Sequence, residues 1–254
     1  MLAAVYERYG PSEVLTLKTV SIPEYDDDEV LIRVHFSTVN RTDCGFLRAE
    51  PFVIRFVAGL TKPKNQIPGS EFSGEVIAIG SAVTDYQPGD RVFGFKDDDY
   101  GFGGLAQYTR MPVNGLMAKI PEHLSYAEAA PGLEGSHYAL SGIRAADMHN
   151  QQHALVNGAT GSIGSAALQI LRSMDISVTA VCATPYTNKI AALGANHVID
   201  YLKEDFTQLD EQFDVVFDSV GKSSFGHCKR ILSPNGIYQS TELAHSVRIR
   251  FWHC

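Results

Sequence analysis

A glycine-rich loop at residues 157–164, Asn-Gly-Ala-Thr-Gly-Ser-Ile-Gly, carries the clearest chemical signal of the chain. It follows a short apolar run and precedes a helical one, so the pattern Ala-x-Gly-x-x-Gly opens a helix directly after a strand. At such a point Gly161 lets the backbone approach a pyrophosphate, and Gly164 lets helix and strand pack closely. Free N–H groups at the helix start would hold the phosphates. The alternative is a glycine-rich turn that binds nothing. The candidate dinucleotide-binding residues are Ala159, Thr160, Gly161, Ser162, Ile163 and Gly164.

The segment that follows the next expected strand bears on which dinucleotide is bound. An NAD site usually has an Asp or Glu about 20 residues beyond the loop, bonded to the ribose 2′-hydroxyl. No acidic residue occurs between Asp175 and Asp200, and this stretch offers Thr184 and Lys189 instead. We therefore expect NADP(H) to be favoured over NAD(H), with Thr184 and Lys189 near the 2′-phosphate. Lys189 can equally be a solvated helix residue.

The elements around this loop alternate between strand and helix. Such alternation is typical of parallel strands joined by right-handed crossovers, and it predicts a doubly wound α/β sheet, the Rossmann fold. Thr184-Pro185 is expected to cap one of the helices and Gly194 to end it. The expected strands are 153–157, 176–182, 197–200, 213–218 and 236–241.

The first half of the chain has a different pattern, with β-rich pieces separated by turn dipeptides. It predicts a mostly antiparallel β domain over residues 1–122, followed by an α/β domain over 123–254. Ser125 and Glu128 form a capping box that predicts a helix start, and a second helix is expected at 134–148, so that residues 123–150 serve as hinge helices. The expected strands of the first half are 14–20, 29–36, 71–80, 90–95 and 105–111.

Composition restricts the class of protein. With 254 residues, 44% hydrophobic and 20% charged, the chain is long enough for two ordinary globular domains. Its net charge is −8, and six of its 29 acidic side chains lie in Asp triplets at 26–28 and 97–99. These triplets are expected to be solvated loops rather than a cation site. Because no basic run exists to bind phosphates, neither nucleic acid nor a membrane is an expected partner.

Cysteine usage and the N-terminus favour a cytoplasmic protein. The four cysteines are far apart, without a paired spacing, which fits a reducing compartment. The first residues lack the basic and apolar pattern of a signal peptide. No window approaches the roughly 18 uninterrupted apolar residues of a membrane-spanning helix.

Further segments stand in the order and spacing of one known family: 37–43 (Ser-Thr-Val-Asn-Arg-Thr-Asp), 68–74 (Pro-Gly-Ser-Glu-Phe-Ser-Gly), 88–94 (Pro-Gly-Asp-Arg-Val-Phe-Gly), 102–108, 193–195, 198–201 and 218–221. With the glycine-rich loop, they make the chain resemble the medium-chain dehydrogenase/reductase superfamily, in its zinc-free, quinone-oxidoreductase-like (zeta-crystallin-like) branch. The resemblance implies a GroES-like β domain on the substrate side and a Rossmann domain for the cofactor, with the active site between them.

The resemblance also bears on zinc. The zinc-dependent alcohol dehydrogenases of the superfamily hold the metal with a Cys where this chain has Asn40 and a His where it has Ser70. Neither amide nor hydroxyl is a usual zinc ligand, so we expect no metal. Glu134 and His137 lie near the segment of the third ligand. A helix-surface Glu and a His satisfied by its neighbours are the favoured interpretation, and a ligand role is the alternative.

Without a Lewis acid, the resemblance implies hydride transfer to a quinone or an α,β-unsaturated carbonyl, whose developing charge hydrogen-bond donors can stabilise. Asn40 is the first candidate for orienting the substrate or the nicotinamide. Asp43 is a candidate positioning residue, or simply a helix cap. By resemblance, Ser136 lies near the nicotinamide, Tyr201 near the adenosine ribose or its 2′-phosphate, and the Val220-Gly221 backbone along the cofactor.

The end of the chain departs from the family. A doubly wound sheet has six strands, whereas five are found here, and residues 242–254 do not resemble the family's continuation. We expect the sixth strand and the C-terminal return to the β domain to be missing, which would weaken a homodimer by exposing a strand edge. Alternatively, residues 247–252, which alternate apolar and basic side chains, form an edge strand.

The expected function is an NADPH-dependent, zinc-independent oxidoreductase that transfers hydride to a small-molecule quinone or enone. The alternative is an NADP(H)-binding sensor or interaction protein with little turnover, and a third possibility is an unstable fragment. The sequence does not name the acceptor.

Overall fold

A computed structural model gives the structure of the chain, which is described here for residues 1–96, 103–149 and 152–241. It divides into two compact units, Met1–Glu134 and Gly135–Cys254. The expected boundary after residue 122 falls earlier than this division, because helix α3 (Tyr126–Ala129) and the 3₁₀ turn η2 (Ala130–Gly132) pack against strands of the first unit. The second Asp triplet and the predicted edge strand at 247–252 lie outside the described residues.

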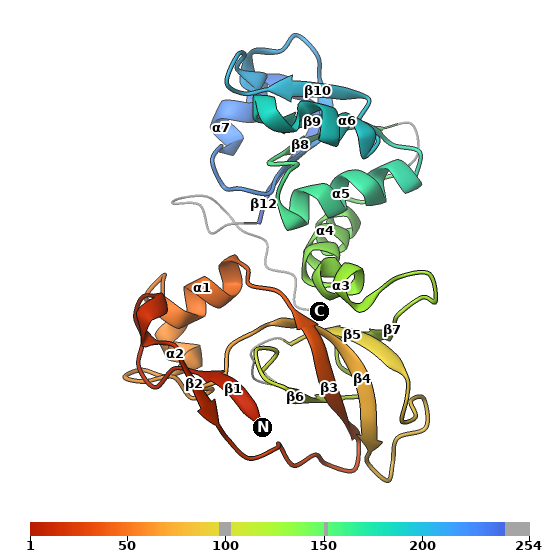
Figure 1. Cartoon of the computed structure of the whole chain (residues 1–254). Helices are drawn as coiled ribbons and strands as arrows, with labels where there is room; N and C mark the ends of the chain where they lie inside the picture. Colours follow the sequence, from red (N-terminus) through yellow and green to blue (C-terminus); the bar gives the residue numbers. More distant parts are fainter. Residues whose placement is uncertain (97–102, 150–151, 242–254) are drawn as a thin grey trace. The chain divides into compact units, whose positions relative to one another are not determined.

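The first unit is built on antiparallel strands, as the sequence predicts. Its five-stranded sheet has the order β6-β3-β4-β5-β7 (Figure 1). The strands are β3 (Glu29–Ser37), β4 (Glu71–Ile79), β5 (Arg91–Phe95), β6 (Tyr108–Pro112) and β7 (Met117–Lys119). A separate pair joins β1 (Leu2–Val5) to β2 (Thr16–Thr19), with the 3₁₀ turn η1 (Ser12–Val14) between them. β1 and β7 were not expected, because both are too short to show an alternating pattern.

Alternation of side chains along the strands builds the core of the first unit. Val30 and Ile32 of β3 and Phe72 and Val76 of β4 are fully buried and lie in one cluster with Met111 of β6. Residues two or four positions apart in a strand face the same side, so one face of the sheet is apolar. The chain segments that follow the strands, including those that carry candidate site residues, therefore start from a packed sheet.

Helices follow strands β3 and β7 of this sheet. α1 (Arg41–Arg48) follows β3, and α2 (Ile54–Ala58) comes shortly after it. The predicted capping box at α3 is confirmed: Ser125 Oγ accepts from the Glu128 N–H, and Glu128 Oε2 accepts from the Ser125 N–H at 2.9 Å. The first Asp triplet is exposed, as expected.

The second unit holds a parallel sheet with the order β10-β9-β8-β11-β12 (Figure 1). In chain order this is 3-2-1-4-5, the strand order of a dinucleotide-binding doubly wound sheet. The expected α/β fold is therefore confirmed. The strands are β8 (His153–Asn157), β9 (Ser177–Cys182), β10 (His197–Asp200), β11 (Phe213–Asp218) and β12 (Leu232–Ser240).

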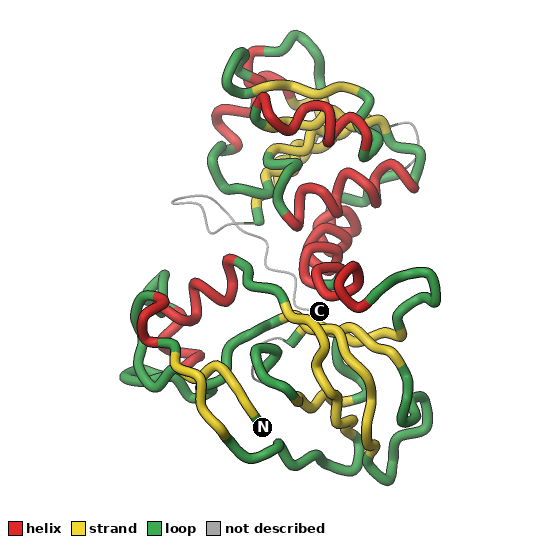
Figure 2. The backbone as a smooth tube through the Cα atoms, in the orientation of Figure 1, coloured by secondary structure: helices red, strands yellow, loops and turns green. Residues whose placement is uncertain are grey.

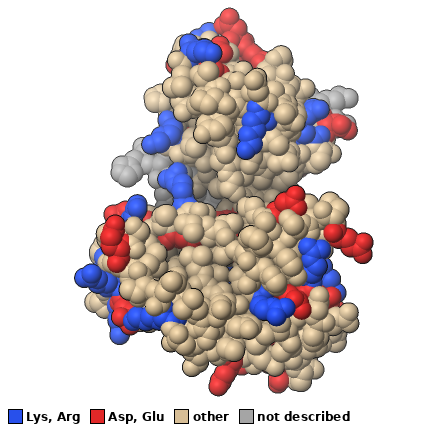
Figure 3. Space-filling view, viewed as in Figure 1, with Lys and Arg blue, Asp and Glu red and all other residues tan. Residues whose placement is uncertain are grey.

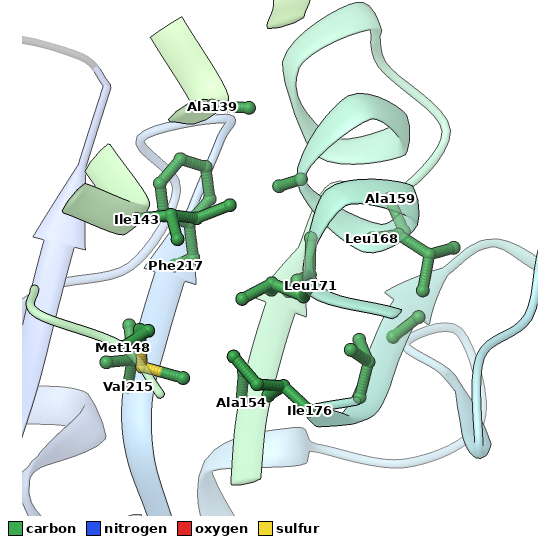
Figure 4. Close-up of a cluster of buried hydrophobic side chains, with 14 of the residues drawn as sticks. Ala139, Ile143, Met148, Ala154, Ala159, Leu168, Leu171, Ile176, Val215 and Phe217 are labelled. Carbon is green, nitrogen blue, oxygen red and sulfur yellow. The ribbon is translucent and has the colours of Figure 1, made fainter. Parts of the chain in front are cut away.

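Helices cover the sheet of the second unit (Figure 2). Successive residues of β8 enter different clusters: Ala154 and Val156 pack with α4 and α5, whereas Leu155 packs with α7 and the turn after it. Figure 4 shows the first of these clusters, with Ile143 of α4 next to Phe217 of β11. A strand buried on both faces is typical of a parallel sheet. The helical elements are α4 (Glu134–Ala145), α5 (Ser162–Ser173), η3 (Thr184–Tyr186), α6 (Thr187–Ala192), η4 (Phe206–Gln208), α7 (Phe225–Cys228) and η5 (Lys229–Ile231).

The predicted cap at Thr184-Pro185 is wrong in its detail. These residues form the 3₁₀ turn η3, whose N-cap is Ala183, and α6 starts only at Thr187. The Thr184 hydroxyl donates instead to Asp200 Oδ2 at 2.5 Å, which a local pattern could not reveal. Gly194 has φ +105°, so it ends the helical segment in a conformation that favours glycine, as predicted.

Two properties of the described residues concern a membrane and nucleic acid, which the sequence does not lead us to expect as partners. Among the described helices, none combines the length and apolar character that crossing a bilayer needs. On the face shown in Figure 3, Lys and Arg atoms are mixed with Asp and Glu atoms over both units.

Candidate active site

The glycine-rich loop joins β8 to α5 in the geometry of a phosphate cradle. Gly158 has φ +82°, and its carbonyl oxygen lies so close to Gly164 that a Cβ on Gly164 would be 2.3 Å from it. A Cβ on Gly161 would meet only that same oxygen, at 3.5 Å. Gly164 is therefore required by protein packing, whereas at Gly161 the protein leaves open space.

The start of α5 presents hydrogen-bond donors beside this space. Gly161 is its N-cap with extended backbone, and the first bond into the helix runs from the Ser165 N–H to the Gly161 carbonyl at 2.9 Å. The N–H groups of Ser162, Ile163 and Gly164 precede it, and these are the groups that a helix leaves without an intrahelical partner. No acidic side chain lies in the first turn to repel an anion.

Ala159 has a different role from its neighbours in the loop. It is fully buried, and its N–H donates to the Val181 carbonyl at 3.1 Å. It therefore ties the loop to β9 and has no N–H free for a phosphate.

A buried carboxylate shapes the loop after β11. Asp218 is fully buried and accepts from the N–H groups of Val220 at 3.2 Å and Gly221 at 3.1 Å. It also accepts from Asn157 Nδ2 at 3.0 Å, at the end of β8. Because Asn157 is the first residue of the glycine-rich loop, one carboxylate connects the two loops that the sequence assigns to the cofactor. The second oxygen of Asp218 accepts from the Ser223 N–H and from the Tyr238 hydroxyl of β12, each at 2.9 Å.

The end of β9 meets the end of β10 at the predicted 2′-phosphate region. Asp200 Oδ2 accepts from Thr184 and lies 3.2 Å from Lys203 Nζ. The Thr184 hydroxyl, the Leu202 N–H and Lys203 hold the pKa of Asp200 below its usual range. Asp200 is thus a carboxylate in the 2′-phosphate region, although it lies farther along the sequence than the acidic residue of a usual NAD site. Its oxygens are already hydrogen-bonded and ion-paired within the protein.

The other candidates of this region are exposed. Tyr201 follows Asp200 and is 55% exposed, and Lys189 lies on the exposed side of α6, without an ion pair among the described residues. Lys203 is the cation that sequence reasoning missed. The available signal was a basic residue three positions after the last residue of a parallel strand, at the edge where ligands bind.

Ser136 belongs to α4, whose first turn packs against the start of α5 beside the glycine-rich loop. Gly135 packs so closely on α5 that a Cβ there would lie 2.3 Å from Ser162 Oγ. Ser136 follows Gly135 directly in α4 and is half-buried. The open cradle, the helix donors and the absence of an acidic first turn fit a dinucleotide in this unit.

In the first unit, Asn40 and Asp43 form the capping box of α1. Asn40 Oδ1 accepts from the Asp43 N–H at 3.0 Å, and Asp43 Oδ2 accepts from the Asn40 N–H at 3.1 Å. The second oxygen of Asp43 accepts from the Ser70 N–H at 2.9 Å. Asp43 therefore caps the helix and also positions Ser70, which follows Gly69, a residue with φ +103°.

The buried carboxyl group of Glu134 accepts hydrogen bonds from the side chains around this cap. Glu134 is 7% exposed, and its Oε2 accepts from Asn40 Nδ2 and, more weakly, from Ser70 Oγ at 3.4 Å. Its Oε1 accepts from Thr42 Oγ1 at 2.5 Å. Asn40 Nδ2 also donates to Ser70 Oγ at 2.8 Å, so the whole Asn40 side chain is engaged within the protein.

The electrostatics of this group are unusual. Burial, with a smaller contribution from the nearby carboxylates of Glu71 and Asp43, raises the pKa of Glu134 to about 7, although the Thr42 hydrogen bond opposes this. Burial also raises the pKa of Asp43 against the hydrogen bonds that it accepts. A carboxyl group that titrates near neutral pH beside several hydroxyl and amide groups can hold or release a proton.

The expectation of a helix-surface Glu134 is wrong. The residue starts α4, but its side chain turns into the first unit toward Asn40, Thr42 and Ser70. The signal available in the sequence was its place in the segment that supplies the third zinc ligand in relatives. His137 is half-buried and its ring contacts Tyr138. Within the described residues, no group of three His, Cys, Asp or Glu side chains could hold a metal.

Comparison with known families agrees with this architecture. Residues 26–122 match the alcohol dehydrogenase GroES-like domain, and residues 193–252 match the zinc-binding dehydrogenase family. The chain is 27% identical to the structure of the quinone oxidoreductase from Coxiella burnetii, with a TM-score of 0.84 over 94% of this chain and 74% of that one.

Curated relatives point the same way. The chain is 35% identical to 2-methylene-furan-3-one reductase of Solanum lycopersicum and 32% identical to the NADPH-dependent alkenal/one oxidoreductase, chloroplastic, of Arabidopsis thaliana. It is 30% identical to quinone-oxidoreductase QR1, chloroplastic, of Triphysaria versicolor. Each match covers 87% of this chain, and 58%, 58% and 67% of the respective relative. The chain belongs to the medium-chain dehydrogenase/reductase superfamily and spans little more than half the length of the first two relatives.

Proposed function

We propose that this protein is an NADPH-dependent oxidoreductase that reduces a small-molecule quinone or α,β-unsaturated carbonyl without zinc. The observation that carries the proposal is the glycine cradle, in which packing excludes a side chain at Gly164 but leaves space for a ligand at Gly161. The names of the relatives, which include enone, alkenal and quinone reductases, support the reaction class.

NADP(H) is the preferred dinucleotide in this proposal. Ser162, Ile163 and Gly164 would hold the pyrophosphate with their N–H groups, while Thr184, Lys189, Tyr201 and Lys203 would surround the 2′-phosphate. When bound, NADPH supplies a hydride. The pairing of the Asp200 carboxylate with Thr184 and Lys203 supports this preference, because an unpaired carboxylate would repel a 2′-phosphate.

The donor set at Asn40 supports zinc independence. Its amide and the Ser70 hydroxyl are poor zinc ligands, and they hydrogen-bond to each other. A quinone or enone needs less activation than a simple ketone, because the added charge spreads to an oxygen that hydrogen-bond donors stabilise. In this proposal the first turn of α1, with Asn40 fixed by Asp43, carries the groups nearest the acceptor oxygen, and Ser136 and the Val220-Gly221 backbone adjoin the nicotinamide.

The test is a comparison of acceptors. NADPH oxidation is followed with a quinone, an enone and a simple ketone, in buffer with a chelator and again with added zinc. Turnover with the quinone or enone in the presence of chelator is the expected result. Turnover only with the ketone, and only with zinc, contradicts the proposal. Tight NADPH binding without turnover over a broad acceptor panel favours a sensor or binding protein instead.

Two accompanying expectations stay proposals. A homodimer would be weak if the strand edge beyond β12 is unpaired, and sedimentation over a range of concentrations tests this. A cytoplasmic location is the second, although two of the relatives are chloroplastic by name.

A further inference from the structure

The buried carboxyl of Glu134 has no role in the function proposed so far. It lies at the last position of the first unit, and its N–H donates to Glu71 Oε1 at 2.8 Å. Three side chains, those of Asn40, Thr42 and Ser70, donate to its two oxygens. No lysine or arginine forms an ion pair with it among the described residues, so it is not a structural salt bridge.

Of its three partners, only one can pass a proton outward. The Asn40 amide does not exchange a proton as an acid would, and the Ser70 hydroxyl is completely buried. Thr42 is half-buried in the first turn of α1, and its hydroxyl makes the short 2.5 Å bond to Glu134 Oε1. A hydroxyl can accept a proton from a carboxyl group on one side while it donates its own on the other.

We propose that Glu134 and Thr42 form a proton relay for the acceptor, in which Glu134 stores the proton and Thr42 delivers it. This inference rests on the proposed reductase function. Hydride addition to a quinone or enone reduces it by two electrons and leaves a hydroquinone or enol anion. The Thr42 hydroxyl proton passes to the anionic oxygen, and the Glu134 carboxyl proton passes to Thr42 Oγ1. The products are the neutral hydroquinone or enol and a Glu134 carboxylate, which then takes up one proton from the bulk solvent.

The surroundings of Glu134 support storage of a proton at neutral pH. The titratable groups that face it are Glu71 of β4 and Asp43 of α1, and both are carboxyl groups. Both oppose a second negative charge in the same buried region, and burial acts in the same direction. The raised pKa, about 7, means that a substantial fraction of Glu134 is protonated near neutral pH.

The chain offers a closely matched control. Thr38 Oγ1 donates to Glu71 Oε2 at 2.8 Å, so Thr38→Val removes the same kind of hydroxyl-to-carboxylate bond a short distance from the relay. The test set is Glu134→Gln, Thr42→Val, Thr42→Ser and the control Thr38→Val. Thermal melts of all four check folding. Thr42→Ser keeps the hydroxyl and removes the methyl group, so it separates the role of the hydroxyl from that of the methyl contact.

The first measurement needs no cofactor. Infrared difference spectra of each protein alone, recorded over pH 5 to 9, follow the C=O stretch of protonated carboxyl groups. We expect a band that titrates near pH 7 in the wild type and in Thr38→Val and that disappears in Glu134→Gln. In Thr42→Val the band should titrate at a higher pH, because the hydrogen bond that opposes the raised pKa of Glu134 is lost. A wild type without such a band contradicts storage of a proton on Glu134.

The second measurement is the pH profile of kcat with NADPH and a quinone. In the wild type, kcat should fall as pH rises above about 7, because Glu134 loses its proton. Glu134→Gln and Thr42→Val should lower kcat at pH 6 by about 100-fold or more, with KM changed little and the profile flattened. Thr42→Ser and Thr38→Val should keep the wild-type profile.

The outcomes separate the two proposals. If the wild type fails to oxidise NADPH with every acceptor tested, the proposed function is refuted. A wild type that turns over, with Glu134→Gln or Thr42→Val keeping its pH profile and kcat, refutes the relay alone. An equal loss of kcat in Thr38→Val and Thr42→Val also refutes it, because the effect would then be structural.

Discussion

The backbone of Gly164 lies directly against the carbonyl oxygen of Gly158, so that a Cβ on Gly164 would be 2.3 Å from that oxygen. Gly158 itself adopts φ +82°, and the strand-to-helix turn therefore depends on two glycines for reasons of folding alone. Gly161, between them, has an ordinary φ of −77° and no atom within 3.4 Å of an ideal Cβ. The fold therefore does not require a glycine here, and the proposed approach of a pyrophosphate would account for its lack of a side chain.

Alanine substitutions at these glycines should separate folding from binding. Gly164→Ala should lower the free energy of unfolding by about 1–3 kcal/mol, because the backbone must shift. Gly161→Ala should leave the melting temperature nearly unchanged but weaken NADPH binding by about tenfold or more, since the methyl group occupies the cradle. Thermal melts and fluorescence titrations with NADPH measure both effects.

Gly226 of α7 provides the control for this pair. It is exposed, and a Cβ there meets only Ser224 Oγ at 3.9 Å, so Gly226→Ala should change neither quantity. Unaltered NADPH affinity in Gly161→Ala would contradict the assignment of the cradle.

Sequence patterns predict this loop because every part of its signal is local. The strand, the glycines and the helix start lie within about 20 residues, and each is set by backbone geometry that residue type reveals. Strands β8, β10 and β11 are predicted with the bounds that the structure gives. β8 and β11 lie inside the sheet and are largely apolar, as strands buried on both faces are, whereas β10 is a short edge strand with two apolar residues at its centre.

The environment of Glu134 could not be predicted in the same way. Its partners Asn40 and Ser70 lie 94 and 64 residues away in sequence, so only the tertiary fold brings them together. A charged residue at the first position of a helix is usually exposed and favours the helix dipole. The same limit applies to Asp200, whose proximity to Thr184 depends on the pairing of β9 with β10.

Lys203, which pairs with Asp200, should determine selectivity between the two dinucleotides. Lys203→Ala removes the cation that lies 3.2 Å from Asp200 Oδ2, leaving its carboxylate to repel a 2′-phosphate. We expect NADPH affinity to fall by about tenfold, a loss that salt would reduce, while NADH affinity changes less than about twofold. Lys189→Ala tests whether that lysine also contributes or is merely solvated.

Parallel titrations with NADPH and NADH measure this selectivity. Lys62→Ala, which removes an exposed lysine of the first unit, is the control. A wild type that binds NADH tenfold more tightly than NADPH would overturn the proposed preference.

Glu134 should make stability depend on pH. Its pKa is raised from 4.5 to about 7, so between these values the folded state binds more protons than the unfolded state. The free energy of unfolding therefore falls as pH rises through this range, by up to about 3 kcal/mol for this group. Glu134→Gln should remove that part of the slope.

Urea unfolding of both proteins at pH 5 and pH 8 measures the difference. The wild type should lose stability relative to Glu134→Gln between the two values. An unchanged difference would mean that Glu134 titrates at an ordinary pKa.

Lys96, which directly follows β5, should show the opposite dependence. It is 3% exposed, and its Nζ donates to Thr109 Oγ1 at 3.2 Å and to the Arg110 carbonyl at 3.0 Å. Burial, and to a smaller extent the charge of Arg110, lower its pKa to about 8. Between pH 8 and 10.5 the unfolded state therefore binds more protons, and the contribution of Lys96 to stability rises with pH.

Lys96→Met removes the buried charge, so the wild type should gain about 2 kcal/mol relative to this variant between pH 7 and 10. Urea unfolding at the two pH values measures the gain, and Lys62→Met, at an exposed lysine, should show none. A constant difference between the wild type and Lys96→Met would show that Lys96 keeps its proton across this range.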